Sequence, residues 1–183
     1  NDKNSAPVIK GNVFGAGAGT NSHGYSALVR GNSYVTVQGE AKVKKSVYGG
    51  GEIASVGKYN INAQGMIESL ANQGSGYCTV VVRDDAVIGP DEEMIMTRNG
   101  GPDDSGHVFG AGKGVLPYEG YKPNEKAWRV TPGNTKQEYL SLNEAKGGTG
   151  ESDYLTYVET LGLATQTYVT VDENAFVKGS VYG

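Results

Sequence analysis

The sequence predicts an all-β fold in which short strands stack as the coils of a parallel β-helix or related β-solenoid, interrupted by long irregular insertions. Two repeats predict this fold: a valine-rich template occurs three times, and an aromatic motif that ends in glycine occurs four times. Composition agrees, because 29 of the 183 residues are glycine, more than twice the usual share, and glycine favours tight turns. Three unrelated amphipathic strands of a β-sandwich are the alternative, since alternating valines alone suit either fold.

The aromatic motif has the form V-[FY]-G-[AG]-G. It reads VFGAG from Val13, VYGGG from Val47, VFGAG from Val108 and a shortened VYG from Val181. Each copy predicts a short strand that ends in a glycine corner.

The valine template, V-x-V-x-x-x-A-x-[VI], begins at Val35, Val80 and Val169. Valines two residues apart lie on one face of a strand, and the triplets that follow them, QGE, RDD and DEN, are prone to turn. The template therefore predicts a strand, a tight corner and a second strand. One such unit cannot bury its apolar face alone, so the units are expected to stack. The valines expected to point inward from successive coils are Val37, Val82 and Val171.

Polar stretches lengthen this repeat. The template and the aromatic motif are 12 residues apart in the first and third copies (47 − 35 and 181 − 169), but 28 residues apart in the second (108 − 80). We therefore expect a single β-solenoid domain over 1–183, with insertions at about 58–76, 89–106 and 115–167.

Three segments in these insertions predict short helices. AQGMIESLANQG (63–74) has helical apolar spacing, and TKQEYLSLNEAKGG (135–148) opens with a capping box and ends in glycine. SDYLTYVETLGLA (152–164) fits a helix or a strand. The second segment has a competing interpretation, because its part from Tyr139 also resembles a degenerate coil that is one residue short.

Charge and cysteine content exclude several classes of protein. The net charge is −4 with no basic stripe, so nucleic acid is not expected as a partner. The sequence has no apolar run long enough for membrane insertion. The lone Cys78 allows no internal disulfide and is expected to be a buried small hydrophobe. GHVFGAGKG departs from the phosphate-binding loop at the first glycine and at the hydroxyl position, so nucleotide binding is not expected.

The two ends of the sequence suggest a segment cut from a longer repeat protein. NDKNSAPVIKG has neither an initiator Met nor an apolar signal core, and the last VYG stops where earlier copies continue. We therefore expect the last coil to fray or to associate end to end, because its strand edges are open.

The V-[FY]-G-[AG]-G corners and the Y-V-T-V strands resemble repeats of large secreted bacterial surface proteins, over residues 13–57, 77–114 and 168–183. The resemblance implies a right-handed parallel β-helix that serves as an adhesin-like or structural stalk and needs no cofactor. The expected function is a non-catalytic structural or adhesive module of a secreted or cell-surface bacterial protein.

Aromatic residues in the longest insertion are the candidate binding residues. Tyr118, Tyr121 and Trp128 lie close together in PYEGYKPNEKAW. Exposed rings on a polar loop suit contact with a glycan or a host-matrix protein. The alternative is that these rings cover the solenoid core.

Acidic turns are the candidate metal site. Asp103 and Asp104 lie in NGGPDDSG, and Ca²⁺ is bound by six to eight oxygen ligands. Solvated turn carboxylates are the simpler interpretation. The alternative function is a carbohydrate-active β-helix enzyme of the polysaccharide lyase or glycosidase type, whose carboxylates would come from the acidic insertion 89–106.

Overall fold

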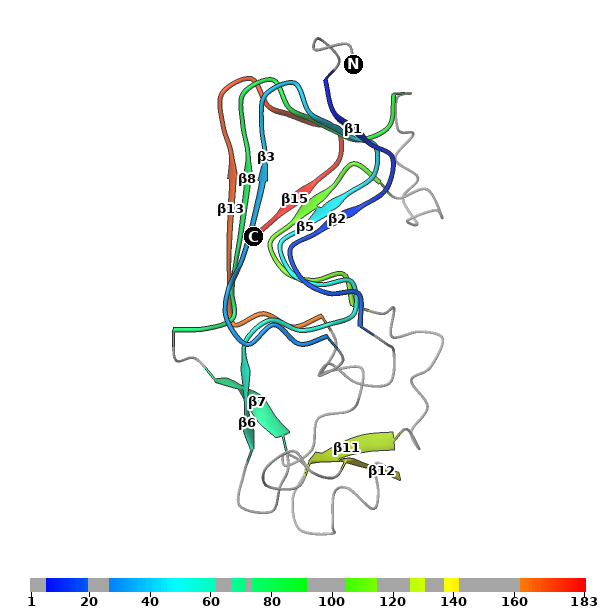
Figure 1. Ribbon diagram of the computed structural model, residues 1–183, viewed down its shortest axis with the longest axis vertical. Helices are drawn as coiled ribbons and strands as arrows, with labels where there is room; N and C mark the ends of the chain where they lie inside the picture. The colour runs from blue at the N-terminus through cyan, green and yellow to red at the C-terminus, as the bar shows by residue number, and fades with distance from the viewer. Residues whose placement is uncertain are drawn as a thin grey trace.

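The computed structural model describes residues 6–19, 27–61, 67–71, 74–91, 105–114, 126–130, 137–141 and 162–183. These residues form three all-parallel sheets that stack as a parallel β-solenoid, with two short antiparallel pairs beside it (Figure 1). The predicted all-β solenoid is therefore confirmed. The β-sandwich alternative is wrong, because a sandwich is built from antiparallel sheets.

Coils 2, 3 and 4 each give one strand to every parallel sheet, and coil 1 gives a strand to the second and third sheets. The first sheet contains β3 (Ser33–Val37), β8 (Tyr77–Val82) and β13 (Gln166–Val171). The second contains β1 (Val8–Ile9), β4 (Lys42–Val43), β9 (Val87–Ile88) and β14 (Phe176–Val177). The third contains β2 (Val13–Phe14), β5 (Val47–Tyr48), β10 (Val108–Phe109) and β15 (Val181–Tyr182). Coil 1 therefore has β1 and β2, coil 2 has β3 to β5, coil 3 has β8 to β10, and coil 4 has β13 to β15.

The repeated motifs align residue by residue across the coils. Val80 pairs with Val35 on one side and with Val169 on the other, as the template predicts. The strands of the aromatic motif stack in the same way, with Val47 between Val13 and Val108. The longer connection between β9 and β10 leaves both registers unchanged.

Apolar side chains at alternate strand positions fill the interior. The largest fully buried side chains are Ile88, Val43, Val47, Val56, Val80, Val82, Val108 and Cys78. Each buried valine stabilises the fold by roughly 1.5–3 kcal/mol relative to an exposed one. Val37 and Val82 point inward as predicted, and Val171, which pairs with Val82, lies on the same face of the sheet. Val171 is nevertheless 40% exposed, because the described residues place no further coil over coil 4.

A left-handed backbone corner follows the first sheet in every coil that contains it. Gly39, Asp84 and Glu173 have φ angles of 65°, 60° and 56°, although only the first is glycine. Such a conformation costs a non-glycine residue about 1–2 kcal/mol. Carboxylates of the next coil hold the first two corners: Asp84 Oδ2 accepts the Gly39 N–H at 2.7 Å, and Glu173 Oε2 accepts the Asp84 N–H at 3.0 Å, which offsets the cost at Asp84. After this corner, Ala86 is fully buried, as the small template residue predicts.

A column of polar side chains precedes the third sheet and ties each coil to the next. Asn12 Oδ1 accepts the Ser46 N–H at 2.9 Å, and Ser46 Oγ accepts the His107 N–H at 3.1 Å. His107 Nδ1 in turn accepts the Ser180 N–H at 2.8 Å. Asparagine, serine and histidine thus have the same role in this column, because each side chain accepts a hydrogen bond from the backbone of the following coil.

An aromatic ladder lies on the third sheet, one residue after the buried valines. The rings of Phe14, Tyr48, Phe109 and Tyr182 stack with centroid distances of 5.0, 4.9 and 4.8 Å. The next position along is glycine because the coils approach closely there. A Cβ atom at Gly49 would collide with the carbonyl oxygen of Gly110 in the next coil.

Two of the predicted helices are wrong over the residues that the structure describes. Residues 67–71 form strand β7 (Ile67–Ala71), which pairs antiparallel with β6 (Lys58–Ile61). Residues 137–141 form β12 (Gln137–Ser141), which pairs antiparallel with β11 (Lys126–Val130). Over the described residues 139–141 the predicted degenerate coil is wrong for the same reason, since β12 joins none of the parallel sheets; residues 142–148 lie outside the described residues. Strand pairing overrides the local helical spacing in both segments. Residues 152–161 lie outside the described residues.

Candidate functional site: an uncharged face of tyrosines and threonines

Strand alternation gives the first sheet an outer face of tyrosines and threonines. In β3 the inward Ser33, Val35 and Val37 are buried, whereas the intervening residues are exposed. The outward positions of the three strands are Tyr34, Thr36, Tyr77, Thr79, Val81, Gln166, Tyr168 and Thr170. We call this surface the Tyr–Thr face. Tyr34 is its most exposed ring, at 72%.

The register across the sheet sets the spacing of the tyrosines. Thr79 pairs with Tyr34 on one side and with Tyr168 on the other. Two strand spacings therefore separate the backbones of these tyrosines, which is about 9–10 Å. Tyr77 lies edge-on to Tyr168, with ring centroids 6.3 Å apart and an interplanar angle of 85°. Edge-to-face packing of this kind restrains the Tyr168 ring before any ligand arrives.

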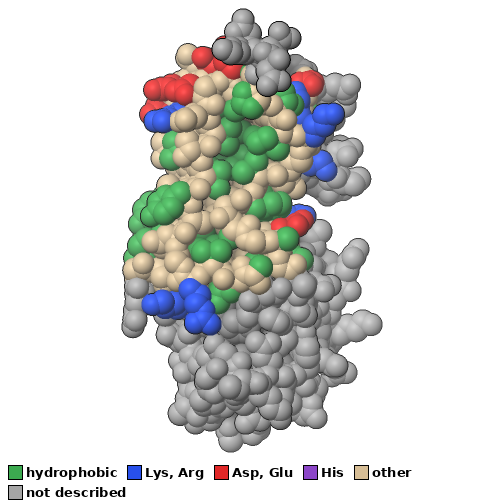
Figure 2. Space-filling view, in the orientation of Figure 1, with side chains coloured by type: hydrophobic (Ala, Val, Ile, Leu, Met, Phe, Trp, Pro, Cys, Tyr) green, Lys and Arg blue, Asp and Glu red, His purple; other side chains and the backbone are tan. Residues whose placement is uncertain are grey.

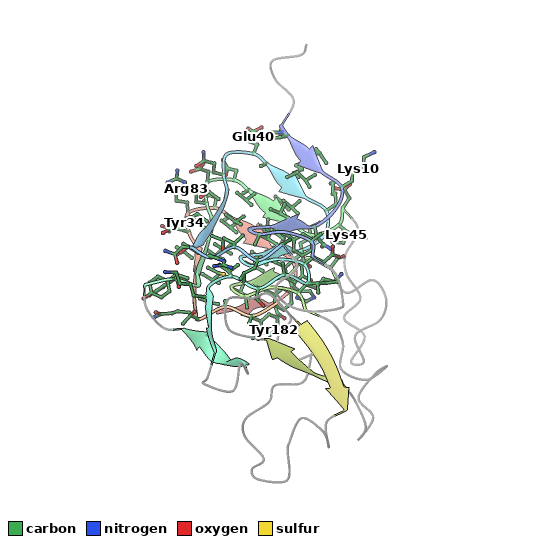
Figure 3. The ribbon with its side chains drawn as sticks, turned by 60° about the horizontal axis from the view of Figure 1, so that its bottom comes forward. Lys10, Tyr34, Glu40, Lys45, Arg83 and Tyr182 are labelled. Atoms are coloured by element: carbon green, nitrogen blue, oxygen red, sulfur yellow. The ribbon has the colours of Figure 1, made fainter. Side chains whose placement is uncertain are left out.

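None of the eight residues of the Tyr–Thr face is an acid or a base. Charge begins at the corner that follows, where Arg83 Nε donates to Gln38 Oε1 at 3.0 Å. Lys10 and Lys45 lie on the opposite side of the solenoid from Tyr34 and Arg83 (Figure 3). A ligand on this face would therefore be recognised by rings and hydroxyl groups, not by ion pairs.

The corner beside this face brings together the carboxyl groups of Asp84 and Glu173, which contact each other. Their side-chain hydrogen bond, and after it the Gly39 N–H, hold the pKa of Asp84 below its usual value. The same bond raises the pKa of Glu173. Among the described residues, no three His, Cys, Asp or Glu side chains come together as a metal site. The pair is therefore a link between coils 3 and 4, since Glu173 Oε2 also accepts the Asp84 N–H.

Lysines line the outer side of the second sheet next to the acidic residue Asp91. Lys44 Nζ forms an ion pair with Asp91, and Lys178 Nζ donates to the carbonyl oxygen of Pro90. These contacts tie the start of the β9–β10 connection to coils 2 and 4. Lys44 and Lys178 thus have structural partners, and we take the uncharged Tyr–Thr face as the stronger candidate for ligand contact.

Most residues that the sequence singled out lie outside the described residues. This is so for Tyr118, Tyr121, Asp103 and Asp104. Trp128 lies in β11, where its backbone pairs with Tyr139 of β12. Cys78 is buried, as predicted, and burial is the main cause that raises the pKa of its thiol.

Comparison with known proteins identifies no relative. No protein-family model, no curated protein and no solved structure matches this chain. Within the described part of the chain, no helix is long and apolar enough to span a bilayer.

Proposed function

We propose that the chain is a non-catalytic structural or adhesive module of a secreted or cell-surface bacterial protein, and that the Tyr–Thr face contacts neutral glycans. One observation carries this proposal: exposed tyrosines and threonines share one uncharged strand face, with Tyr34 at 72% exposure. The resemblance of the repeated corners to bacterial surface proteins supports the extracellular setting.

The chemistry of this face fits a neutral sugar chain. The face of a tyrosine ring is electronegative and accepts the C–H groups of a sugar, while threonine hydroxyls both donate and accept hydrogen bonds to sugar hydroxyls. Tyr34 and Tyr168, one on each side of Thr79, present two such rings to one extended ligand. Because the rings stand on a three-stranded sheet, the backbone that carries them is already ordered before binding.

The test is binding of the labelled chain to immobilised neutral glycans, acidic glycans and host-matrix proteins. It is run with Ca²⁺ and with a chelator, because Asp103 and Asp104 were candidate calcium ligands. The informative variant carries Tyr34→Ala and Tyr168→Ala together. Lys45→Gln is the matched control, because Lys45 lies on the opposite side of the solenoid (Figure 3).

The double variant is expected to weaken binding of a neutral glycan about tenfold or more, since each ring contributes roughly 1 kcal/mol. Lys45→Gln should leave that affinity unchanged. Equal binding by the wild type and the double variant would remove the Tyr–Thr face from the proposal. A loss confined to Lys45→Gln on acidic glycans would move the contact to the lysine side. No binding to any ligand in either buffer would leave only the structural role.

A further inference from the structure

Four lysines gather where the strands of the second sheet end. Lys10, Lys44 and Lys178 directly follow β1, β4 and β14. Lys42 and Lys44 flank the fully buried Val43, so both lie on the outward side of the sheet. We call Lys10, Lys42, Lys44 and Lys178 the lysine cluster. Basic side chains gather on the upper right of Figure 2, which is the side that carries β1 in Figure 1.

Backbone pairing sets the spacing of the lysine cluster. The Lys44 N–H bonds to the last carbonyl oxygen of β1 at 2.8 Å, and the Lys178 N–H bonds to the last carbonyl oxygen of β9 at 3.0 Å. Lys10 and Lys44 therefore stand about one strand spacing apart, roughly 4.8 Å. Gly89 occupies the equivalent position in coil 3, and a Cβ atom there would come within 2.8 Å of Lys178 Cβ. Glycine thus leaves room for the Lys178 side chain to cross coil 3.

The lysine cluster already holds one carboxylate. Lys44 Nζ forms an ion pair with Asp91, and Lys178 Nζ donates to the Asp91 carbonyl oxygen at 3.3 Å. The hydrogen bond from Lys44 lowers the pKa of Asp91, and the charges of Lys178 and Lys42 act in the same direction. The Asp91 side chain is 80% exposed, so this carboxylate lies at a position that is open to solvent.

The lysine cluster carries more positive charge than Asp91 neutralises. Four lysines and one aspartate leave a local net charge of +3 (4 − 1), although the whole chain has a net charge of −4. Lys10 and Lys42 are exposed, and neither forms an ion pair among the contacts of the described residues. A local excess of one sign attracts a ligand of the opposite sign.

We infer that the lysine cluster binds an acidic polysaccharide, and that Asp91 occupies part of this site and weakens the binding. A carboxylate is the charged group of a uronic acid, and Lys44 already pairs with one. Lysines on neighbouring strands suit an extended chain that carries one charge on each of several units. Nucleic acid is the less favoured polyanion, because phosphate recognition favours the planar fork of arginine and the cluster contains lysine alone.

This site is separate from the Tyr–Thr face and does not depend on it. Lys10 lies on the opposite side of the solenoid from Tyr34 (Figure 3). A neutral glycan on the Tyr–Thr face would be recognised by rings and hydroxyl groups, whereas an acidic chain on the lysine cluster would be recognised by ion pairs. Salt therefore distinguishes the two sites, since it screens exposed charges.

The experiment measures the affinity of the labelled 183-residue chain for polygalacturonate, for neutral dextran and for double-stranded DNA, at low and high salt. The weakening variant carries Lys10→Gln and Lys42→Gln together. Lys58→Gln with Lys113→Gln is the matched control, because it removes the same charge from exposed lysines outside the cluster. Asp91→Asn removes the competing charge and keeps an acceptor oxygen for Lys44.

The Lys10→Gln and Lys42→Gln variant is expected to weaken polygalacturonate binding at low salt about fivefold, and the control should bind like the wild type. Asp91→Asn should strengthen that binding about threefold, a gain that damage to the fold would not produce. High salt should weaken binding by the wild type.

The inference is overturned if the wild type does not bind polygalacturonate at low salt, or if the weakening variant binds like the control. It is overturned equally if Asp91→Asn binds no more tightly than the wild type. Tighter binding of DNA than of polygalacturonate at the same salt would replace the polysaccharide with nucleic acid. Dextran binding that is unchanged in all these variants would leave the Tyr–Thr face standing on its own test.

Discussion

His107 Nδ1 accepts the backbone N–H of Ser180 at 2.8 Å, and this bond joins the polar column of coil 3 to coil 4. His107 is 3% exposed, so water cannot readily replace the acceptor. In the same column Asn12 Oδ1 accepts the backbone N–H of Ser46. The side chain at this position is therefore needed as an acceptor for the next coil.

His107→Leu is expected to lower the free energy of unfolding by roughly 1–3 kcal/mol, because the Ser180 N–H loses its partner. His107→Asn should lower the free energy of unfolding by less, since asparagine already occupies the equivalent position in coil 1. Urea denaturation of the three proteins measures the difference. Equal losses from leucine and asparagine would mean that the acceptor contributes nothing.

Burial differs along the stacked side chains of the second sheet, so the cost of a valine-to-alanine substitution is expected to differ between coils. Val43 is fully buried, whereas Val177 in the same column of coil 4 is half-buried. Val43→Ala is expected to cost about 2 kcal/mol or more, because it removes two methyl-sized groups and leaves a cavity. Val177→Ala should cost clearly less by the same urea titration. A greater loss from Val177→Ala would contradict the packing described here.

The close approach of the coils predicts that Gly49 cannot be replaced. In Gly49→Ala the new Cβ meets the Gly110 carbonyl oxygen, which belongs to the backbone and cannot move aside. A loss of about 3 kcal/mol or more, or failure to fold, is expected. Gly11→Ala is the control, because nothing lies within 4 Å of its Cβ. Circular dichroism and urea denaturation compare the two, and similar stability of both variants would count against the stacked register.

The carboxyl pair of Asp84 and Glu173 predicts a dependence on pH. The pKa of Asp84 is lowered, so its contribution is present above its usual value of 3.8 and is lost as the pH falls through the folded-state pKa. The pKa of Glu173 is raised, so its contribution is present below its usual value of 4.5 and is lost as the pH rises through the folded-state pKa. The pair stabilises most between these two titrations, where it holds one proton.

In Glu173→Gln the side-chain amide can donate a hydrogen bond to the Asp84 carboxylate at any pH, so the bond no longer depends on protonation of a carboxyl group. The variant should melt at a higher temperature than the wild type at neutral pH, where the two carboxylates repel each other. The two melting curves should converge in mild acid, between the titrations of the pair. A variant that melts below the wild type at neutral pH would show that the charge of Glu173 is needed for another contact.

The columns of the solenoid could be predicted because the same residue types recur at a fixed spacing. Val35, Val80 and Val169 align as the template required, and the turn triplets form the corners between strands. In coil 1 the aromatic motif predicted β2, but β1 was not predicted, although Ile9 precedes Val13 by four residues, as Val43 precedes Val47. β1 has no counterpart in the valine template, because that template begins with the valines of the first sheet and coil 1 has no described strand there.

Features that depend on pairing between distant segments could not be predicted in the same way. Residues 67–71 have helical spacing, but they form β7 because β6 offers a strand edge. The Tyr–Thr face was missed although its signal was present. Tyr34 and Tyr168 each stand one position before a template valine, which is an outward position of a strand. The clustering of aromatic residues in the sequence instead points to the longest insertion.

The separations between stacked strands have a consequence for chain entropy. Val35 and Val80 are 45 residues apart (80 − 35), while Val80 and Val169 are 89 apart (169 − 80). Loop-closure entropy grows only with the logarithm of length, so this near doubling costs coil 4 about 0.6 kcal/mol. A single methylene buried in the core contributes about 0.8 kcal/mol, which is more. A solenoid of this kind can therefore carry segments of very different length between its coils, as long as each following strand pairs in register with the preceding coil.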